Sequence, residues 1–146
     1  MKAVQSYNTA MSRRGPSAPL KFLESKNLLH GNVLDYGCGK GADYKYLASR
    51  GYSSEGFDPY WEPKDLSGAR FETILCTYVL NVIDKSDESD VLNKIKKLLK
   101  PGGKAYISVR RDIKKDGPTS RGFQRKVFLD LETIKSSSSY CIYCLK

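Results

Sequence analysis

One stretch of the chain, residues 33–43 with the sequence VLDYGCGKGAD, restricts the possible folds more than any other. An apolar, strand-like run leads directly into glycines at positions 37, 39 and 41, and a helix-like run follows them. Glycine lets the backbone turn tightly and come close to a ligand, because it has no Cβ that would clash. The amides of such a turn and the start of the next helix favour a negatively charged group. We therefore expect a strand, a ligand-binding turn and a helix, in that order.

The rest of the sequence continues this alternation of short apolar runs with amphipathic ones. It predicts strands at residues 32–36, 52–57, 71–79 and 104–109, and helices at 17–29, 42–50 and 86–100, the last ended by residues 101–103. Residues 127–131 and 140–145 are expected to form a closing antiparallel pair. Strands alternating with helices are typical of an α/β layer fold with a mainly parallel sheet. We predict a single domain, residues 1–146, in which residues 1–30 flank the site.

The glycine spacing and two acidic residues narrow the class of ligand. A nicotinamide-binding turn would show G-x-G-x-x-G, whereas this chain has G-x-G-x-G with Asp35 two residues before the first glycine. A second acid, Asp58, ends the next expected strand 23 residues later, where a carboxylate can accept both hydroxyls of a ribose. This combination resembles motif I of the class I S-adenosylmethionine methyltransferases, which have a Rossmann-like fold.

A more specific resemblance covers most of residues 8–112. The run Thr9–Arg13, the DYGCGKGAD turn, Asp58-Pro59 and the run Tyr78–Ile83 resemble the methyltransferases associated with DNA phosphorothioation genes, whose members are mostly longer. That resemblance implies S-adenosyl-L-methionine as the cofactor and a link to DNA modification.

The class I pattern also implies which residues hold the cofactor. Asp35, with Tyr36 and the three glycines Gly37, Gly39 and Gly41, is expected at the methionine end, and Asp58 at the ribose. Pro59 and Tyr60 are expected against the adenine, together with the end of the 71–79 strand, which includes Thr77 and Tyr78.

The segment between Asp58 and the run at 71–79 is too short for a complete class I sheet. Only residues 59–70 are available, whereas one strand-helix-strand unit takes about 30 residues. Extended, this segment reaches ~40 Å, enough to pass one neighbouring strand. We therefore predict that the strand that normally follows the second one is missing, and that residues 71–79 pair directly with residues 32–36.

Little side-chain chemistry is expected at the reacting atoms, because the methyl donor is already activated and positioning supplies most of the rate. Tyr78 and Asn81 follow the strand at 71–79, where class I enzymes contact the methyl acceptor, and are the predicted catalytic residues. The carbonyl of Asn81 could orient an amine or hydroxyl nucleophile. The alternative for Asn81 is a cap at the start of a helix.

The net charge of +9 is concentrated in two segments, residues 1–21 and residues 110–126. A basic mouth for an anionic substrate and a merely well-solvated surface both fit this pattern. The candidates for substrate contacts are Arg13, Arg111, Arg121 and Gln124. The sequence favours a methyltransferase that acts on nucleic acid or a nucleotide-like anion. A small-molecule methyltransferase and a non-catalytic S-adenosylmethionine-binding module of a DNA-modification complex are the alternatives.

The cysteines and the absence of long apolar runs complete the predictions. Cys141 and Cys144 form C-x-x-C, but three residues along a strand turn the two thiols to opposite faces. With only one histidine in the chain, we expect structural cysteines and no metal site. No run reaches the ~20 apolar residues of a membrane span, and the N-terminus lacks a signal-peptide core, so a cytoplasmic protein is expected.

Overall fold

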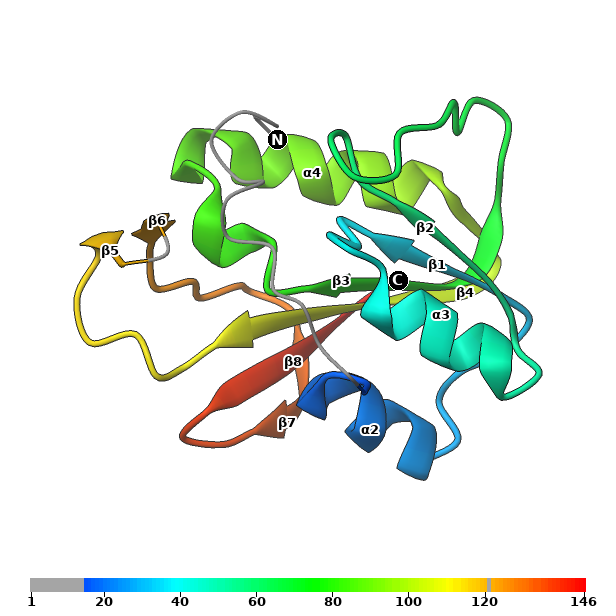
Figure 1. Ribbon diagram of the computed structural model, residues 1–146, viewed down its shortest axis with the longest axis horizontal. Coiled ribbons are helices and arrows are strands. Elements are labelled where there is room, and N and C mark those ends of the chain that lie inside the picture. Colours follow the sequence, from blue (N-terminus) through cyan, green and yellow to red (C-terminus); the bar gives the residue numbers. More distant parts are fainter. Residues whose placement is uncertain (1–14, 121) are drawn as a thin grey trace.

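In a computed structural model, which describes residues 15–120 and 122–146, the chain forms a six-stranded sheet and a small two-stranded hairpin (Figure 1). The large sheet has the strand order β2-β1-β3-β4-β8-β7, and the hairpin pairs β5 with β6. The elements are α2 (Ala18–Ser25), β1 (Asn32–Tyr36), α3 (Ala42–Ser49), β2 (Ser53–Phe57), β3 (Phe71–Thr77), the 3-10 helix η2 (Leu80–Val82), α4 (Lys85–Lys97), β4 (Leu99–Arg110), β5 (Gly117–Thr119), β6 (Gly122–Gln124), β7 (Glu132–Ser136) and β8 (Tyr140–Leu145).

Four neighbouring strands run parallel, and the predicted shortening of the sheet is confirmed. β1 pairs with β2 on one side and directly with β3 on the other, so that Asp35 lies opposite Leu75. β4 continues the parallel part beside β3, and β8 is antiparallel to β4. Residues 59–70 contain no strand, and only the isolated bridge Asp58–Glu62 marks their start. The chain therefore has the predicted Rossmann-like α/β fold with one strand fewer after β2.

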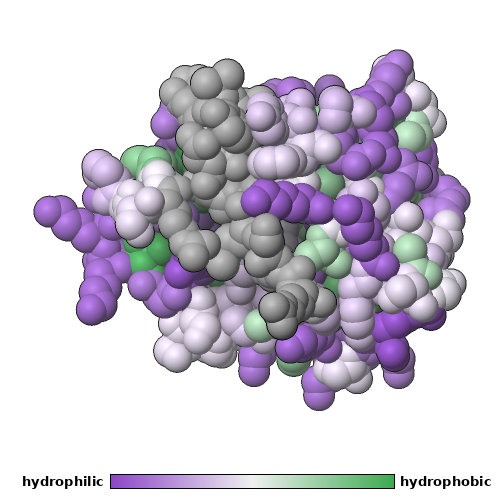
Figure 2. All heavy atoms as spheres, viewed as in Figure 1, coloured by the Kyte–Doolittle hydropathy of each residue, from purple (hydrophilic) through white to green (hydrophobic). Residues whose placement is uncertain are grey.

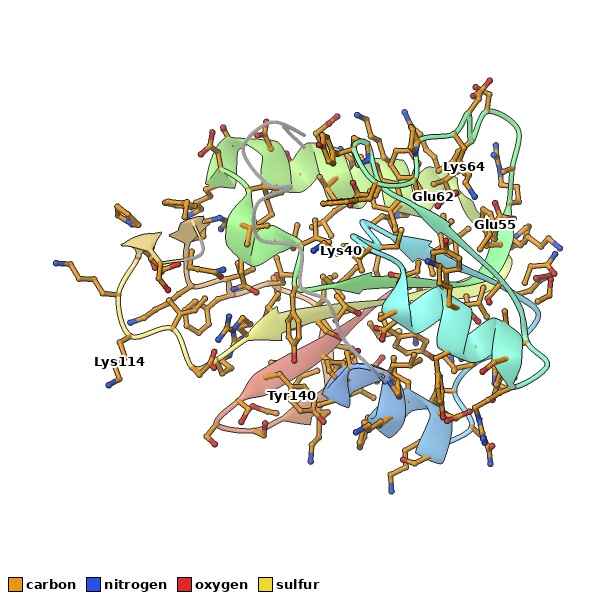
Figure 3. All side chains as sticks on the ribbon, in the orientation of Figure 1. Lys40, Glu55, Glu62, Lys64, Lys114 and Tyr140 are labelled. Carbon is orange, nitrogen blue, oxygen red and sulfur yellow. The ribbon has the colours of Figure 1, made fainter. Side chains whose placement is uncertain are left out.

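The short 59–70 segment runs back along the edge strand β2. Lys64 forms an ion pair with Glu55 of β2 at 3.6 Å (Figure 3), and Leu66 packs against the core on the α4 side. A cavity of about 510 Å³ lies between this segment and the end of α4, with Tyr36 and Phe57 in its wall. The loop thus covers the sheet edge without extending the sheet.

The side chains of each strand alternate between the two faces of the sheet, and different helices cover each face. In Figure 1, α4 lies on one side of the sheet and α2 and α3 on the other. The residues that form the α4-side core include Leu34, Ile74, Cys76, Ile107, Val91 and Ile95. The residues that form the opposite core include Val33, Leu75, Tyr106, Leu20, Leu23 and Leu47. Because successive strand residues point to opposite faces, adjacent positions such as 33 and 34 enter different cores.

The helices begin where predicted but end earlier. Ser17 caps α2, since its hydroxyl accepts a hydrogen bond from the Leu20 N–H at 3.3 Å. The helix ends at Ser25 instead of residue 29, because Asn27 takes a left-handed conformation with φ of 55°. The predicted stop of α4 at residues 101–103 is wrong, because α4 ends at Lys97 and those residues already belong to β4. No helix in the described part is both long and apolar enough to cross a bilayer.

The predicted strand at residues 127–131 is also wrong. The partner of β8 is β7, and the Ser137 N–H closes the tight turn between them by donating to the Tyr140 carbonyl at 2.9 Å. Such a turn makes the residues just before it the partner strand, whatever the apolar pattern further upstream. Val127 instead packs into the α4-side core, and its carbonyl accepts a hydrogen bond from Arg111 at 2.7 Å.

The two thiols of the C-x-x-C sequence lie on opposite faces of β8, as predicted. Cys141 belongs to the α4-side core and Cys144 to the α2-side core. Both thiols are buried and free. Each cysteine therefore contributes to packing on its own side of the sheet.

Candidate functional site

The glycine turn, residues 37–41, leaves the carboxyl end of β1 and is tied to the end of β2. The amides of Gly37 and Cys38 both donate to the Phe57 carbonyl, at 2.7 and 2.9 Å. Gly37 has φ of 82°, and a Cβ at this position would meet Cγ2 of Val79. Burial raises the pKa of the Cys38 thiol, so this side chain stays neutral inside the turn. The turn is thus close-packed against the segment that follows β3, and only glycine fits at position 37.

Asp58 lies against this turn, as its position at the end of β2 predicts. Its Oδ2 accepts from the Gly39 N–H at 3.0 Å, and its Oδ1 accepts from the N–H groups of Tyr60 and Trp61 at 2.9 and 3.0 Å. Two turns of the chain therefore converge on one carboxylate. The geometry places a fixed negative charge beside the backbone amides of residues 37–41.

Residues 58–62 and the start of α3 form a cover beside the glycine turn. Pro59 and Tyr60 were predicted near this site, but the contacts of Tyr44, Glu62 and Trp61 were not. Tyr44 donates a hydrogen bond to Glu62 at 3.2 Å, and burial together with this bond raises the pKa of Tyr44 to about 12. The ammonium of Lys40 lies 5.2 Å from the centre of the Trp61 ring, and the rings of Tyr60 and Trp61 meet edge to face. Figure 3 labels Lys40 and Glu62 in this region. Tyr60 and Trp61 are exposed.

A buried carboxylate joins the starts of α2 and α3. Asp43 accepts two hydrogen bonds from Ser17, one from its N–H at 2.8 Å and one from its hydroxyl at 2.7 Å. Ser17 therefore has two roles, because it also caps α2. The pair fixes the entry of α2 next to the glycine turn, which lies directly before Asp43.

An open cleft of about 840 Å³ lies at the carboxyl ends of β3 and β4. Its walls come from the start of α2, from the end of β4 and the chain that follows it, and from the β5–β6 hairpin. Tyr78 lines it from a left-handed backbone with φ of 63°, held by a hydrogen bond from its N–H to the Ser108 carbonyl at 2.8 Å. Arg110 lines it too and is paired with Asp112 through two hydrogen bonds of 2.9 and 2.8 Å. In open parallel sheets, ligands bind at this edge.

Comparison with known proteins decides the family. A methyltransferase-domain family model matches residues 7–134. The chain belongs to this family. Its sheet has the Rossmann-like α/β arrangement that the class I resemblance implies. Among curated protein sequences, none matches the chain significantly.

Solved structures similar to this chain share its fold. A TehB-like SAM-dependent methyltransferase from Corynebacterium glutamicum has a TM-score of 0.59 and 19% identity, over 86% of this chain and 84% of that one. The 1,6-didemethyltoxoflavin-N1-methyltransferase of Burkholderia thailandensis has a TM-score of 0.61 and 19% identity, over 96% and 77%.

A third structure, concerned with the conversion of a disulfide bond into a thioacetal group during echinomycin biosynthesis, has a TM-score of 0.60 and 25% identity over 67% of this chain. The chain spans 51% of the length of that protein and 56% of the length of a glycopeptide N-methyltransferase.

The residues of the glycine turn fit S-adenosylmethionine. By the class I pattern, the amides of residues 37–41 would hold its methionine part and Asp58 its ribose. The close contact of Gly37 with Val79 keeps the turn free of a side chain, and the Asp58 carboxylate lies within hydrogen-bond reach of the turn. When bound, the cofactor supplies an electrophilic methyl group on a sulfonium sulfur.

The other predicted cofactor residues divide into two groups. Asp35 is buried near the end of β1, Pro59 and Tyr60 lie in the cover, and Thr77 ends β3 beside Tyr78, so all five lie where the parallel strands end. The contacts predicted for them with the cofactor stay predictions. Tyr36 differs, because its ring packs on Phe57 in the α4-side core. Only the backbone of Tyr36 is left for the predicted contact.

Asn81 does not fit its predicted catalytic role. It is fully buried in η2, where its Oδ1 accepts from the Arg110 N–H and its Nδ2 donates to the Arg125 carbonyl, both at 2.8 Å. The Asn81 carbonyl in turn accepts from the Arg125 N–H at 2.8 Å. The side chain therefore joins β4 to the segment after β6, and neither the nucleophile-orienting role nor the helix-cap alternative describes it.

Arg111 also has a structural role in place of the predicted substrate contact. Its guanidinium donates to the Val127 carbonyl at 2.7 Å and to the Tyr143 hydroxyl at 2.6 Å, and lies over the Phe128 ring. Strand alternation turns Arg110 toward the cleft and Arg111 to the opposite face. Arg13 and Arg121 lie outside the described residues. Of the predicted substrate residues in the described part, Gln124 alone lines the cleft.

Proposed function

We propose that this methyltransferase transfers a methyl group from S-adenosylmethionine to a small molecule that carries an anionic group. The observation that supports this proposal is the cleft of about 840 Å³ at the ends of β3 and β4. Tyr78 of its wall precedes Val79, the residue that packs against Gly37 of the glycine turn. The volume of the cleft falls in the range of small-molecule sites, about 300–1,000 Å³. On transfer, the acceptor gains the methyl group and releases a proton, and the sulfonium becomes the thioether of S-adenosylhomocysteine.

The rim of the cleft supplies positive charge for the anionic group. Lys114 and Lys115 line it, and neither forms an ion pair with a described residue. Figure 3 shows Lys114 on the chain between β4 and β5, pointing away from the body of the protein. In Figure 2, hydrophilic side chains project from the same side, where the β5–β6 hairpin lies. Uncompensated lysines at a cleft mouth raise the local concentration of anions.

A nucleic-acid substrate, the finer prediction from the sequence, receives less support from the described residues. That prediction counted the bases of residues 110–126 as a free surface. Arg111 and Arg125 are engaged inside the protein, with Tyr143 and with Glu88 respectively. Arg110 lines the cleft, where Asp112 neutralises its charge. Binding to nucleic acid and a part in phosphorothioation-linked DNA modification therefore stay predictions, and the assay below includes them.

The test of the proposed function is a transfer assay with radiolabelled S-adenosylmethionine. Pools of carboxylated and phosphorylated small molecules, DNA and RNA are offered separately. We expect label in the small-molecule fraction. Label in DNA or RNA alone, with binding that falls steeply as salt rises, would assign the nucleic-acid function instead.

We predict that Asp58→Ala weakens S-adenosylmethionine binding by about 10–100-fold, the equivalent of one or two buried hydrogen bonds. The substitution removes the carboxylate and leaves the N–H groups of Gly39, Tyr60 and Trp61 without their acceptor. Isothermal titration calorimetry measures the change. Asp65→Ala is the matched control, because Asp65 makes a similar turn with Ser67 in the same loop and accepts at 2.9 Å. Absence of any cofactor binding by the unmodified protein would refute the function itself.

We also predict that replacing Lys114 and Lys115 together by alanine lowers kcat/KM for an anionic acceptor about tenfold at low salt. Cofactor affinity should not change, because neither lysine contacts the glycine turn. Lys85→Ala with Lys96→Ala removes the same charge from exposed positions of α4, away from the cleft. Equal losses in both double variants would show a general effect of net charge and would count against a basic rim.

A further inference from the structure

Gln124 is a buried amide whose carbonyl oxygen is not used by the protein. The residue is 7% exposed and lines the cleft. Its Oε1 is buried and has no hydrogen-bond partner. Within the described part, Asp87 Oδ2 and Ser108 Oγ share this state, but neither residue lines the cleft. Most buried side-chain polar groups in proteins have a partner, so each exception calls for a reason.

The protein holds Gln124 in place by its neighbours along the chain. Gln124 ends β6 and pairs with Gly117 in the hairpin. The next residue, Arg125, is fixed by two hydrogen bonds with Asn81 and by its guanidinium, which reaches the Ile83 carbonyl at 2.7 Å and Glu88 at 2.9 Å. The backbone at position 124 therefore cannot shift to give the amide a partner inside the protein.

The unpartnered oxygen of Gln124 destabilises the folded protein, and no other contact of this oxygen offsets the loss. Leaving a buried acceptor without a donor costs about 1–3 kcal/mol. A ligand that donates to Oε1 and accepts from Nε2 removes that loss when it binds. Because Oε1 has almost no exposed surface, the amide must first turn about its last side-chain torsion, which is broad in glutamine, before a ligand in the cleft reaches this oxygen.

We propose that Gln124 determines acceptor specificity by pairing with a neighbouring donor and acceptor on the acceptor molecule, the edge of a carboxamide or of an amino-substituted heterocycle. Glutamine matches such an edge with two parallel hydrogen bonds. Tyr78, in the same cleft, offers an aromatic ring for a planar group of this kind. This inference rests on the proposed function, because it names the acceptor class of the same cleft.

The test compares probe pairs that differ at this edge. Adenine is compared with purine, and nicotinamide with methyl nicotinate, by ligand-observed NMR with the cofactor site saturated by S-adenosylhomocysteine. We expect the unmodified protein to bind adenine about tenfold more tightly than purine, and nicotinamide about tenfold more tightly than methyl nicotinate. A factor of about ten is what a hydrogen bond between uncharged groups contributes. Gln124→Met should abolish both preferences and raise Tm by about 3 °C, because it removes the orphaned amide at similar volume.

Ser108→Ala is the matched control. It removes a hydroxyl that likewise has no partner, on β4 but outside the cleft wall, so it should also raise Tm and should keep both probe preferences. If the unmodified protein shows no preference or binds none of the probes, or if Gln124→Met keeps the preference, the inference is wrong. Binding of S-adenosylhomocysteine distinguishes the two proposals. If the protein does not bind it, the proposed function is refuted and not only the role of Gln124.

Discussion

Arg125→Ala is expected to destabilise the protein by about 3–5 kcal/mol, the effect of removing one partner of a buried ion pair. The Arg125 guanidinium donates to Glu88 at 2.9 Å, and the two side chains are 7% and 18% exposed. It also satisfies the Ile83 carbonyl at 2.7 Å. Alanine would leave the Glu88 carboxylate and that carbonyl without their donor, in a protein whose total stability is expected to be about 5–15 kcal/mol. Urea denaturation measures the loss.

A surface pair on the same helix is the control for Arg125→Ala. Lys94 and Asp90 of α4 lie 3.1 Å apart but are 56% and 57% exposed. Lys94→Ala should change stability by less than about 0.5 kcal/mol, because solvent screens exposed pairs. Replacing Arg125 and Glu88 together by methionine and leucine should restore part of the loss. A loss for Arg125→Ala as small as that for Lys94→Ala would contradict the burial of the pair.

The fold was predictable because its signals are local. The apolar run at β1, the glycines after it and the spacing of Val91 and Ile95 on α4 each specify one element within a few residues. The missing strand also followed from length alone, since residues 59–70 are too few for a strand-helix-strand unit. β7 was not predicted because Glu132–Ser136 is less apolar than residues 127–131. The pairing is decided instead by the position of the turn at Ser137.

The sequence predicted where in the sheet the residues of the glycine turn and Asp58 lie, whereas their contacts with a cofactor stay predictions. Glycines in alternation and an acid after the second strand imply a turn and a carboxylate at the same sheet edge, and the contact of Asp58 with Gly39 bears out that proximity. The acceptor side was not predictable in the same way. Whether Arg111, Arg125 or Asn81 is free depends on partners 16 to 44 residues away in the sequence, such as Val127 and Glu88. A count of charges treats both arginines as available, and the position of Asn81 after a strand does not reveal its partners.

Gly37→Ala is expected to lower S-adenosylmethionine affinity on the order of 100-fold, about 3 kcal/mol. Two effects combine at this position. With φ of 82°, a residue with a Cβ is strained by about 1–2 kcal/mol. In addition, the new Cβ would meet Cγ2 of Val79, a buried residue of the α4-side core that has little room to move.

The contact with Val79 is what connects this strain to the site. To relieve the clash between the new Cβ and Val79, the turn must move away from the segment after β3. This movement would strain the hydrogen bond of 2.7 Å that the Gly37 N–H donates to the Phe57 carbonyl. Gly51→Ala isolates the backbone effect, because Gly51 has φ of 91° but a Cβ added there would meet nothing within 4 Å. It should cost about 1–2 kcal/mol of stability and leave calorimetric cofactor affinity unchanged. Wild-type affinity in Gly37→Ala would mean that the turn does not approach the cofactor closely.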